Sequence, residues 1–489
     1  MSRSEKNKLI IALSLAMFLA AIEGTIITLA IPTIVKDLMG FNLISHVFSV
    51  YMLTSAIATP VYGKLSDMYG RKRILLIGIG IFIFGSALCG LSQSMVMLIF
   101  FRAIQGLGAG SIFTVPMTIV GDVFPLGERG KVQGALGMVW GIAGLVGPFL
   151  GGLLIDLLSW HWIFFINVPL GIVTIFIIQT SFNESVVKQK HRIDFLGIAV
   201  LSLAMIAFLS IFVFADDTGI QLNFQNAALL IISAVMLVVF YRVEKRATEP
   251  IVPFDVLTKS SIFVNCIAML FCGALIGVDV YTPIFLQNIR GFGPLIAGLI
   301  ILPMSISWML ASIPLGKLII RFGGKAVNAT GVILALISLF PLLLFAKDSS
   351  VLFIISIVFA MGIGMGAGMT AQTMIIQDSV GFEKRGSAVA VTSLLRTLGQ
   401  TIGISIFGAV FNGRIVRGFS QEGIEKYNLG NLYDLSAYGK GVSWDQIVDV
   451  LTSAFHTVVF LFIFLMVLSS VLALIMPRPL VSQRSKDTK

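Results

Sequence analysis

Apolar stretches alternate with short polar ones along almost the whole chain. Windows of about 18–25 apolar residues are long enough to cross a bilayer as a helix. Fourteen such windows occur, near residues 9–31, 43–63, 74–93, 95–120, 131–156, 163–182, 194–215, 225–241, 261–285, 294–318, 326–346, 350–376, 386–411 and 450–476. The pattern predicts an all-α polytopic membrane protein with fourteen transmembrane spans.

The composition agrees with this class. Hydrophobic residues make up 57% and charged residues 12% of the 489 residues, far from the balance of soluble domains. Cys89, Cys266 and Cys272 lie in apolar runs, which supports neither a disulfide framework nor a CxxC metal site. The first run is too long for a signal-peptide core, so it is expected to remain as the first span.

The basic residues predict the orientation in the membrane, because cytoplasmic loops are enriched in Lys and Arg. The two tails and the even-numbered loops hold 25 of the 34 basic residues, and the odd-numbered loops hold 7. Both termini of this multi-pass protein are therefore expected on the cytoplasmic side of the cell membrane. The net charge of +10 is then a topology signal and an attraction to membrane lipids, and nucleic-acid binding is not expected.

An internal repeat relates two parts of the chain at an offset of 256 residues, which places Glu23 on Asp279. The same offset places Gly106, Gly108, Gly110, Asp122, Arg129 and Gly130 on Gly362, Gly364, Gly366, Asp378, Arg385 and Gly386. Duplicated halves with a buried acid at equivalent positions are typical of a transporter whose site lies at the repeat interface.

The repeat also predicts the domain organisation. The parts are a first six-helix half (1–182), an inserted helix pair (183–241), a cytoplasmic linker (242–260), a second six-helix half (261–476) with an extracellular segment (412–449), and a basic cytoplasmic tail (477–489). The extracellular segment has no readable chemistry.

Glu23 is the first candidate functional residue, since an ionised acid in mid-membrane costs about 2.5–3.5 kcal/mol on insertion scales. It lies about 14 residues, or about 21 Å, into a helix that runs outward, and Arg102 lies about 10 Å into one that runs inward. In a core about 30 Å thick they reach similar depths and could pair. The simpler alternatives are a static hydrogen-bonded acid and an arginine that snorkels to the interface.

Two further charges lie in predicted spans of the second half. Asp279 is expected to be a second proton or cation site, or else a structural acid that caps a kink before Pro283. Arg396 is expected to have a charge partner within the second half, which the sequence does not identify.

Several motifs carry a family resemblance. The segment from Gly63 to Arg73 (GKLSDMYGRKR) resembles the signature loop of the major facilitator superfamily. Residues 22–32 are similar to the first-helix motif of its fourteen-helix drug:proton antiporters, with Glu23 where many members carry Asp. Other similar segments are 102–108, 147–152, 160–171, 194–197 and 244–250.

This resemblance implies a major facilitator fold of two six-helix halves plus two inserted helices. It implies a multidrug efflux pump of the quaternary-ammonium and quinolone type, which exchanges a proton for a lipophilic, often cationic, drug. No cofactor or metal is expected, the proton gradient supplies the energy, and the pump is expected to act as a monomer. The runner-up is an exporter or flippase of an endogenous lipid-like or amphipathic metabolite.

The signature loop predicts an inner gate made by Gly63, Asp67, Gly70, Arg71 and Arg73. Its charges are expected to bridge neighbouring helix ends and hold the outward-facing state. The alternative is a solvated turn that only sets topology. The second-half copy, residues 316–325, has Ile320 in place of the acid, so the gate is expected to be asymmetric.

Small residues recur at helical spacing in the fifth span, so that one face of this helix can contact another helix closely. Such a face suits the sliding of helices that alternating access requires, and static packing is the alternative. The residues of this packing motif are Gly137, Gly141, Gly144, Gly147, Pro148, Gly151 and Gly152. The 38 phenylalanines and 20 methionines allow an adaptable apolar pocket, although most are expected to face lipid or core.

Other protein classes lack their motifs. An ATP-driven pump needs GxxxxGK[ST], and neither Gly63-Lys64 nor Gly316-Lys317 is followed by Ser or Thr. A hydrolase of the GxSxG or HExxH type is not supported either, so no enzyme activity is expected. A channel or sensor stays open, and saturable, proton-linked exchange in vesicles would separate a transporter from both.

Overall fold

The computed structural model is almost entirely helical. It describes residues 3–38, 43–184, 194–213, 224–247, 250, 252, 254–421 and 443–477. No strand occurs among these residues. The predicted tail 477–489 lies outside the described part of the chain, apart from its first residue.

The first half consists of seven helical segments. They are α1 (Arg3–Leu38), α2 (Ile44–Tyr69), α3 (Arg71–Gly90), α4 (Met95–Val123), α5 (Leu126–Leu157), α6 (Trp162–Phe165) and α7 (Asn167–Ser181). The last two make up one predicted span.

The inserted pair and the second half follow. The inserted helices are α8 (Phe195–Val213) and α9 (Phe224–Glu244). The second half contains η2 (Phe254–Val256), α10 (Lys259–Ile284), the π-helical turn η3 (Phe285–Ile289), α11 (Pro294–Ser312), α12 (Leu315–Phe322), α13 (Gly324–Leu339), η4 (Phe340–Leu344), α14 (Val351–Asp378), η5 (Phe382–Lys384), α15 (Arg385–Gln421) and α16 (Trp444–Ile475).

The helices follow the predicted apolar windows. Twelve helices of the described chain are long and apolar enough to cross a membrane. The apolar helix 195–211 is shorter, and α2 is not among the twelve, so the count of fourteen spans stays a prediction. The window 294–318 is broken at Pro314, because proline has no N–H to continue the helical hydrogen bonds.

The predicted extracellular segment 412–449 is helical at both ends. Helix α15 continues to Gln421, and α16 already begins at Trp444. A serine side chain caps the start of α16, since Ser443 accepts a hydrogen bond from the backbone N–H of Gln446. Amphipathic and polar turns therefore extend these helices beyond the apolar windows, and residues 422–442 lie outside the described chain.

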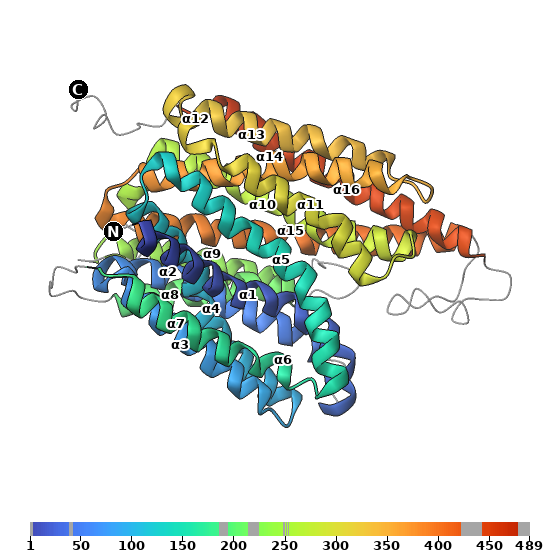
Figure 1. Ribbon diagram of the computed structural model, residues 1–489, viewed down its shortest axis with the longest axis horizontal. Coiled ribbons are helices and arrows are strands. Elements are labelled where there is room, and N and C mark those ends of the chain that lie inside the picture. The colour runs from blue at the N-terminus through green and yellow to red at the C-terminus, as the bar shows by residue number, and fades with distance from the viewer. Residues whose placement is uncertain are drawn as a thin grey trace.

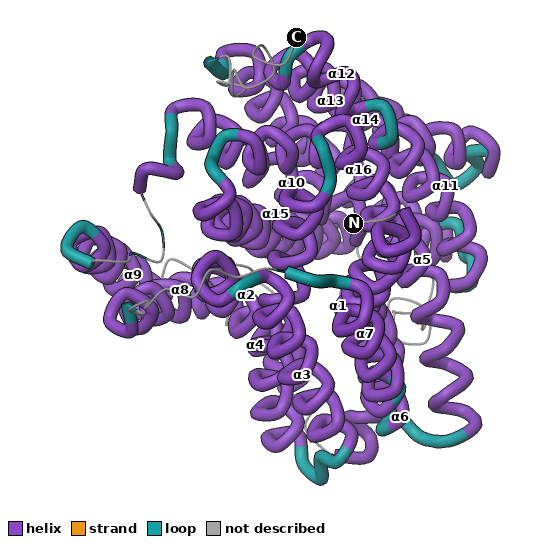
Figure 2. The backbone as a smooth tube through the Cα atoms, turned by 60° about the vertical axis from the view of Figure 1, so that its left-hand side comes forward, coloured by secondary structure: helices purple, strands orange, loops and turns teal. Residues whose placement is uncertain are grey.

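The two halves form separate helical bundles that meet along two seams (Figure 2). Helix α5 packs along α11 and α12, and α2 packs along α15. Helix α8 contacts α2 and α15, and it joins α9 to the rest of the molecule (Figure 2). Each half has its own apolar core, so the bundles are connected mainly through these seams.

Close contact between α10 and α15 depends on glycine. A Cβ at Gly399 would lie 2.0 Å from the carbonyl oxygen of Met269, and one at Gly403 would lie 2.7 Å from that of Gly273. The two backbones therefore touch, as small residues allow between membrane helices. This contact fixes α10, which carries Asp279, against α15, which carries Arg396.

We expect Gly399→Ala to destabilise the protein by about 1–3 kcal/mol, because the added methyl group has no room beside the Met269 carbonyl. Thermal unfolding of the purified protein in lipid nanodiscs measures the effect. Gly413→Ala on the same helix is the matched control, since nothing lies within 4 Å of a Cβ there. Equal stability of the two variants would contradict the close contact.

Candidate functional site

Glu23 of α1 and Arg102 of α4 form a buried ion pair. Arg102 Nη1 lies 2.5 Å from Glu23 Oε1, and the side chains are only 1% and 3% exposed, respectively. Helices α1 and α4 therefore adjoin at this depth, as the predicted pair requires. Two charges withdrawn from water remain costly unless their other hydrogen-bonding atoms also find partners.

The second carboxylate oxygen of Glu23 has such a partner. Asn167, the first residue of α7, donates from Nδ2 to Glu23 Oε2 at 2.7 Å and to Ser86 Oγ of α3 at 3.0 Å. The Ser86 hydroxyl in turn donates to the carbonyl oxygen of Phe164 at 2.9 Å. A polar chain therefore connects the acid to α3 and α6.

The guanidinium of Arg102 is also surrounded. Its Nη1 donates to Gln105 Oε1 at 2.8 Å, and its Nε donates to the Val47 carbonyl oxygen at 3.2 Å. The Tyr51 ring centre lies 4.1 Å from the guanidinium carbon, a cation–π distance. Helices α1, α2, α4 and α7 thus converge on one pair of charges.

The network keeps spare hydrogen-bonding atoms. Asn167 Oδ1, Gln105 Nε2 and the Tyr51 hydroxyl are buried and have no hydrogen-bond partner within the described residues. These atoms can form new hydrogen bonds with Glu23 or Arg102 when the charge of Glu23 changes. Gln105 and Asn167 lie within the segments 102–108 and 160–171, but the sequence analysis gave neither residue a role. An amide side chain inside an apolar run is a sign of a polar site, as the carboxylate of Glu23 is.

Asp279, the repeat mate of Glu23, has a different environment. Its side chain is exposed, although Val278 and Tyr281 beside it are buried. Within the described chain Asp279 forms no hydrogen bond or ion pair. The alternative in which it caps a kink before Pro283 requires such a hydrogen bond and is therefore not supported. An acid in a membrane helix is tolerated where it faces other protein or a water-filled path, and Asp279 has no protein partner in the described chain.

Arg396 of α15 has neutral partners only. Its Nη2 donates to Thr373 Oγ1 at 2.9 Å and to the Met369 carbonyl oxygen at 3.1 Å, both on α14. No carboxylate lies within ion-pair distance of it among the described residues. The expected charge partner in the second half is therefore not found, and the residue is 9% exposed.

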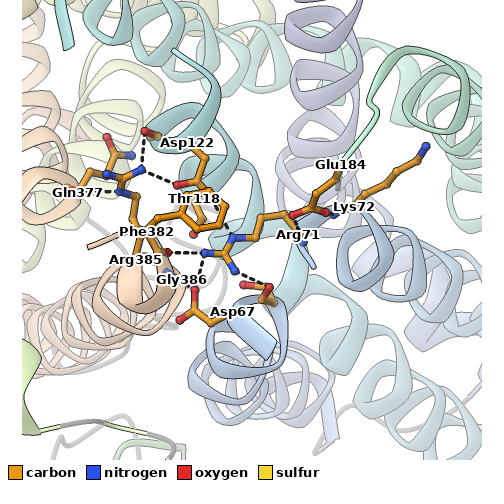
Figure 3. A network of polar contacts seen from close by, with 12 residues as sticks. Asp67, Arg71, Lys72, Thr118, Asp122, Glu184, Gln377, Phe382, Arg385 and Gly386 are labelled. Carbon is orange, nitrogen blue, oxygen red and sulfur yellow. Dashed lines mark hydrogen bonds and ion pairs between the residues drawn. The ribbon is translucent and has the colours of Figure 1, made fainter. Parts of the chain in front are cut away.

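The predicted gate residues gather where α2 ends and α15 begins (Figure 3). Asp67 Oδ1 accepts from the Gly386 N–H at 2.8 Å, and Oδ2 accepts from the Ser387 N–H and hydroxyl at 2.7 and 2.8 Å. The first N–H groups of a helix lack internal partners and favour a negative charge. An acid of the first half therefore caps a helix of the second half.

Arginines extend this contact across the gate (Figure 3). Asp122 at the end of α4 lies 3.1 Å from Arg71 Nε and 2.5 Å from Arg385 Nη1. Arg71 Nη2 also lies 2.6 Å from Asp67 Oδ1 and donates to the Phe382 carbonyl oxygen at 2.9 Å. From the sequence, Asp122 and Arg385 are only landmarks of the repeat, so their place in this network of ion pairs is a structural finding.

The remaining gate residues divide into two groups. Gly70 has φ of 94°, which favours glycine, and a Cβ at Gly63 would lie 2.2 Å from that of Ala390. Both therefore shape the gate. Arg73, predicted to share the bridging role, is exposed and forms no hydrogen bond or ion pair with described residues. Arg73 therefore takes no part in the bridging contacts of this arrangement, and a gate role for it stays a prediction.

The gate is asymmetric, as expected from the loop copies. Ile320, at the position of the missing acid, is 63% exposed. The second junction is built from backbone contact, since a Cβ at Gly316 of α12 would lie 2.1 Å from the Leu126 carbonyl oxygen. Charges therefore join the halves at one seam and close packing at the other.

The packing motif of α5 faces two partners. Gly137 and Gly141 approach Trp308 and Ser305 of α11, whereas Gly147 approaches Thr25 of α1. Gly144 and Gly152 have open space beside them, and the side chain of Pro148 lies outside the described part. Gly151 is buried.

No group of three or more His, Cys, Asp or Glu side chains in the described chain is arranged to hold a metal ion. The chemistry that this arrangement offers is instead charge pairing and proton binding on single buried acids.

The sequence was compared with protein-family models and with known proteins, and both comparisons give the same family. The sequence model described as Major Facilitator Superfamily matches residues 13–404. Multidrug resistance protein 3 of Bacillus subtilis (strain 168) is 32% identical over 497 residues, which cover 98% of this chain and 97% of that protein. Multidrug efflux pump SdrM of Staphylococcus aureus (strain N315) is 32% identical, with 82% of this chain and 89% of that protein covered.

Solved structures share the fold. The human organic anion transporter MFSD10 (TETRAN) is similar with a TM-score of 0.62 at 14% identity, covering 95% of this chain and 100% of that chain. A bacterial homologue of the iron transporter ferroportin in its outward-facing state has a TM-score of 0.61 at 12% identity, covering 96% and 98%. At such identities the likeness concerns the fold alone.

We expect Arg102→Gln to destabilise the protein by about 3–5 kcal/mol, because it leaves the Glu23 charge buried without its partner. The double variant Glu23→Gln/Arg102→Gln removes both charges and should recover most of this loss. Thermal unfolding in nanodiscs measures both. A double variant as unstable as Arg102→Gln alone would mean that the two charges do not compensate each other.

We expect Asp67→Asn to impair transport while insertion and substrate binding stay nearly intact. The amide loses charge-assisted hydrogen bonds worth about 1.5–3 kcal/mol each, so the closed gate becomes less populated. Accessibility labelling of single cysteines near the inner end should show more inward-open protein.

The arginines of the same loop provide a matched pair for this test. Arg71→Gln should act like Asp67→Asn, because Arg71 joins Asp67 to Asp122. Arg73→Gln should label and transport like the unaltered protein. Unchanged labelling with full transport in Asp67→Asn would remove the gate assignment.

Proposed function

The chain belongs to the major facilitator superfamily, and on that premise we propose that it exports lipophilic, cationic drugs in exchange for protons, by alternating access. Relatives named as multidrug resistance and efflux proteins, one of them matched over nearly its whole length, support drug export. The family and the fold are those of a multi-pass membrane transporter rather than an enzyme.

The buried pair of Glu23 and Arg102 is the observation that carries the proposal. While Glu23 is ionised, Arg102 balances its charge at 2.5 Å. A proton on Glu23 cancels the attraction and leaves the guanidinium to its neutral partners. Proton binding therefore changes the forces between α1 and α4, and a ligand with different affinity for two states shifts the balance between them.

Asp279 supplies the second acid of the proposed mechanism. It is exposed and has no charged partner in the described chain, so it is available to a cationic group of the substrate. Glu23 is then the proton carrier, and Asp279 is the residue that attracts the cation. When more positive charge enters with protons than leaves with the drug, the membrane potential adds about 2.3 kcal/mol per charge and 100 mV to the driving force.

The gate supports alternating access with both termini in the cytoplasm. The turns between α2 and α3, α4 and α5, and α14 and α15 meet at one end, where Arg71, Asp122 and Arg385 pair. The start of α1 and the end of α16 lie toward the same end in Figure 1. In our proposal this is the cytoplasmic end of fourteen spans, and the gate is closed there.

We expect Glu23→Gln to insert but to lose pH-driven efflux, with cationic substrates affected more than neutral ones. The amide keeps the size of the side chain and removes both the proton site and the charge. Substrate-induced proton release and gradient-driven uptake in everted vesicles, at matched expression, measure the effect. Asp279→Asn should reduce efflux of cations and do less to proton release.

Two control variants distinguish the loss of the Glu23 charge from a loss of folded protein. Glu128→Gln changes an exposed acid that pairs only with Lys6 at the surface, where an ion pair contributes little. It should behave like the unaltered protein. Glu23→Gln/Arg102→Gln tests whether a fold without either charge still transports. An active Glu23→Gln variant with unaltered pH dependence would refute the assignment.

A further inference from the structure

Gln377, in the last turn of α14, reaches across the gate into the first half. Its Nε2 donates to the Met117 carbonyl oxygen of α4 at 2.6 Å, and its Oε1 accepts from Gln133 Nε2 of α5 at 3.1 Å. The side chain of Gln377 is fully buried, and that of Gln133 is 4% exposed. One amide of the second half therefore holds two helices of the first half without any charge.

Gln377 also contacts its own repeat mate. The offset of 256 residues places Gly121 on Gln377. A Cβ at Gly121 would lie 3.0 Å from Cδ and 3.1 Å from Cγ of Gln377, so the amide side chain packs over the glycine. Two equivalent residues of a repeat touch only near the axis that relates the halves. Gln377 therefore lies at the centre of the gate, in the space left by the missing side chain of Gly121.

The backbone of Gln377 is connected to the charged part of the gate. Its carbonyl oxygen accepts from Arg385 Nε at 2.8 Å, and Arg385 Nη1 lies 2.5 Å from Asp122 Oδ1. Arg385 Nη1 also donates to the Gly121 carbonyl oxygen at 2.8 Å. Figure 3 shows Gln377, Arg385 and Asp122 beside one another. Gln377 thus connects the ion pairs at the seam of α2 and α15 with α5, which forms the other seam.

We propose that Gln377 is the central lock of the inner gate, an uncharged residue whose amide must leave Met117 and Gln133 before the halves can separate at this end. The inference rests on the proposed function, since alternating access is what requires the halves to separate. Bonds that exist only in the closed state shift the balance between closed and open protein. A buried hydrogen bond changes such an equilibrium by about 2- to 10-fold.

The ratio of open to closed protein is measured from the distance between two spin labels, one on each half. Glu128→Cys and Arg321→Cys provide the labelling sites, because both side chains are exposed and belong to the first and second half, respectively. Cys266→Ser removes the exposed native cysteine, and Cys89 and Cys272 are buried. The full chain is held in lipid nanodiscs without drug and without a proton gradient.

We expect Gln377→Met to raise the ratio of open to closed protein by about three- to tenfold, because methionine keeps the length of the side chain and loses both hydrogen bonds. Gln133→Met should raise the ratio less, since Gln377 keeps its bond to Met117. The double variant should be no more open than Gln377→Met alone, because both substitutions remove the same bond. If Gln377→Met does not fold, Gln133→Met and its effect on the ratio decide the question.

Gln372→Met is the matched control, because Gln372 is a buried glutamine of the same helix whose amide forms no hydrogen bond with the described residues. It should leave the ratio of open to closed protein unchanged. An unchanged ratio in Gln377→Met would overturn the lock. A lower melting temperature of Gln377→Met without a change in the ratio would do the same, since it marks a role in packing alone.

Asp67→Asn serves as the reference for an opened gate and separates this inference from the proposed function. If Asp67→Asn shows a second, longer distance and Gln377→Met does not, the lock is refuted and alternating access stands. If neither variant shows a second distance, the halves do not separate at this end, and the proposed transport mechanism fails with the lock. Because neither drug nor gradient is present, the result does not depend on the proton-coupling assignment.

Discussion

A charge inside a membrane protein is costly unless it finds an opposite charge, hydrogen-bond partners or water, and the structure depends on this constraint. The first half satisfies it with Glu23 and Arg102, which pair at 2.5 Å and collect polar groups from four helices. In the second half, Asp279 has no partner in the described chain, and Arg396 has neutral partners only. The two acids at equivalent positions of the repeat, Glu23 and Asp279, therefore have different surroundings, which suits different tasks.

The gate applies the same constraint at a helix end. Asp67 accepts the free N–H groups of α15, and Asp122 balances Arg71 and Arg385 from the two halves at once. At the other seam, Ile320 offers no charge and Gly316 lets α12 touch the start of α5. Separating the first seam breaks strong, directional bonds, whereas α5 meets α11 and α12 through close packing and is joined to α14 by one amide hydrogen bond, from Gln133 to Gln377. The two seams therefore respond to different perturbations.

Much of this could be predicted from the sequence, because apolar run length and residue type are local properties. The helices follow the expected windows, and similar depth correctly suggested that Glu23 and Arg102 could meet. Which helix faces which is not a local property, so Asn167 and Tyr51 were missed as partners. For the same reason the sequence could not show that Arg73 forms no bridging contact in this structure: the charge of a residue is visible in the sequence, and the direction of its side chain is not.

Helix α4 connects the buried pair with the gate. It carries Arg102 near one end and Asp122 near the other, twenty residues or about 30 Å apart, with Pro116 between them. A change of charge at Glu23 alters the force on one end of this helix, and Asp122 holds its other end to Arg385 of the second half. Coupling between distant sites requires an element that both sites bias. In the proposed mechanism helix α4 is this element, since each of its ends is anchored by an ion pair to a different helix.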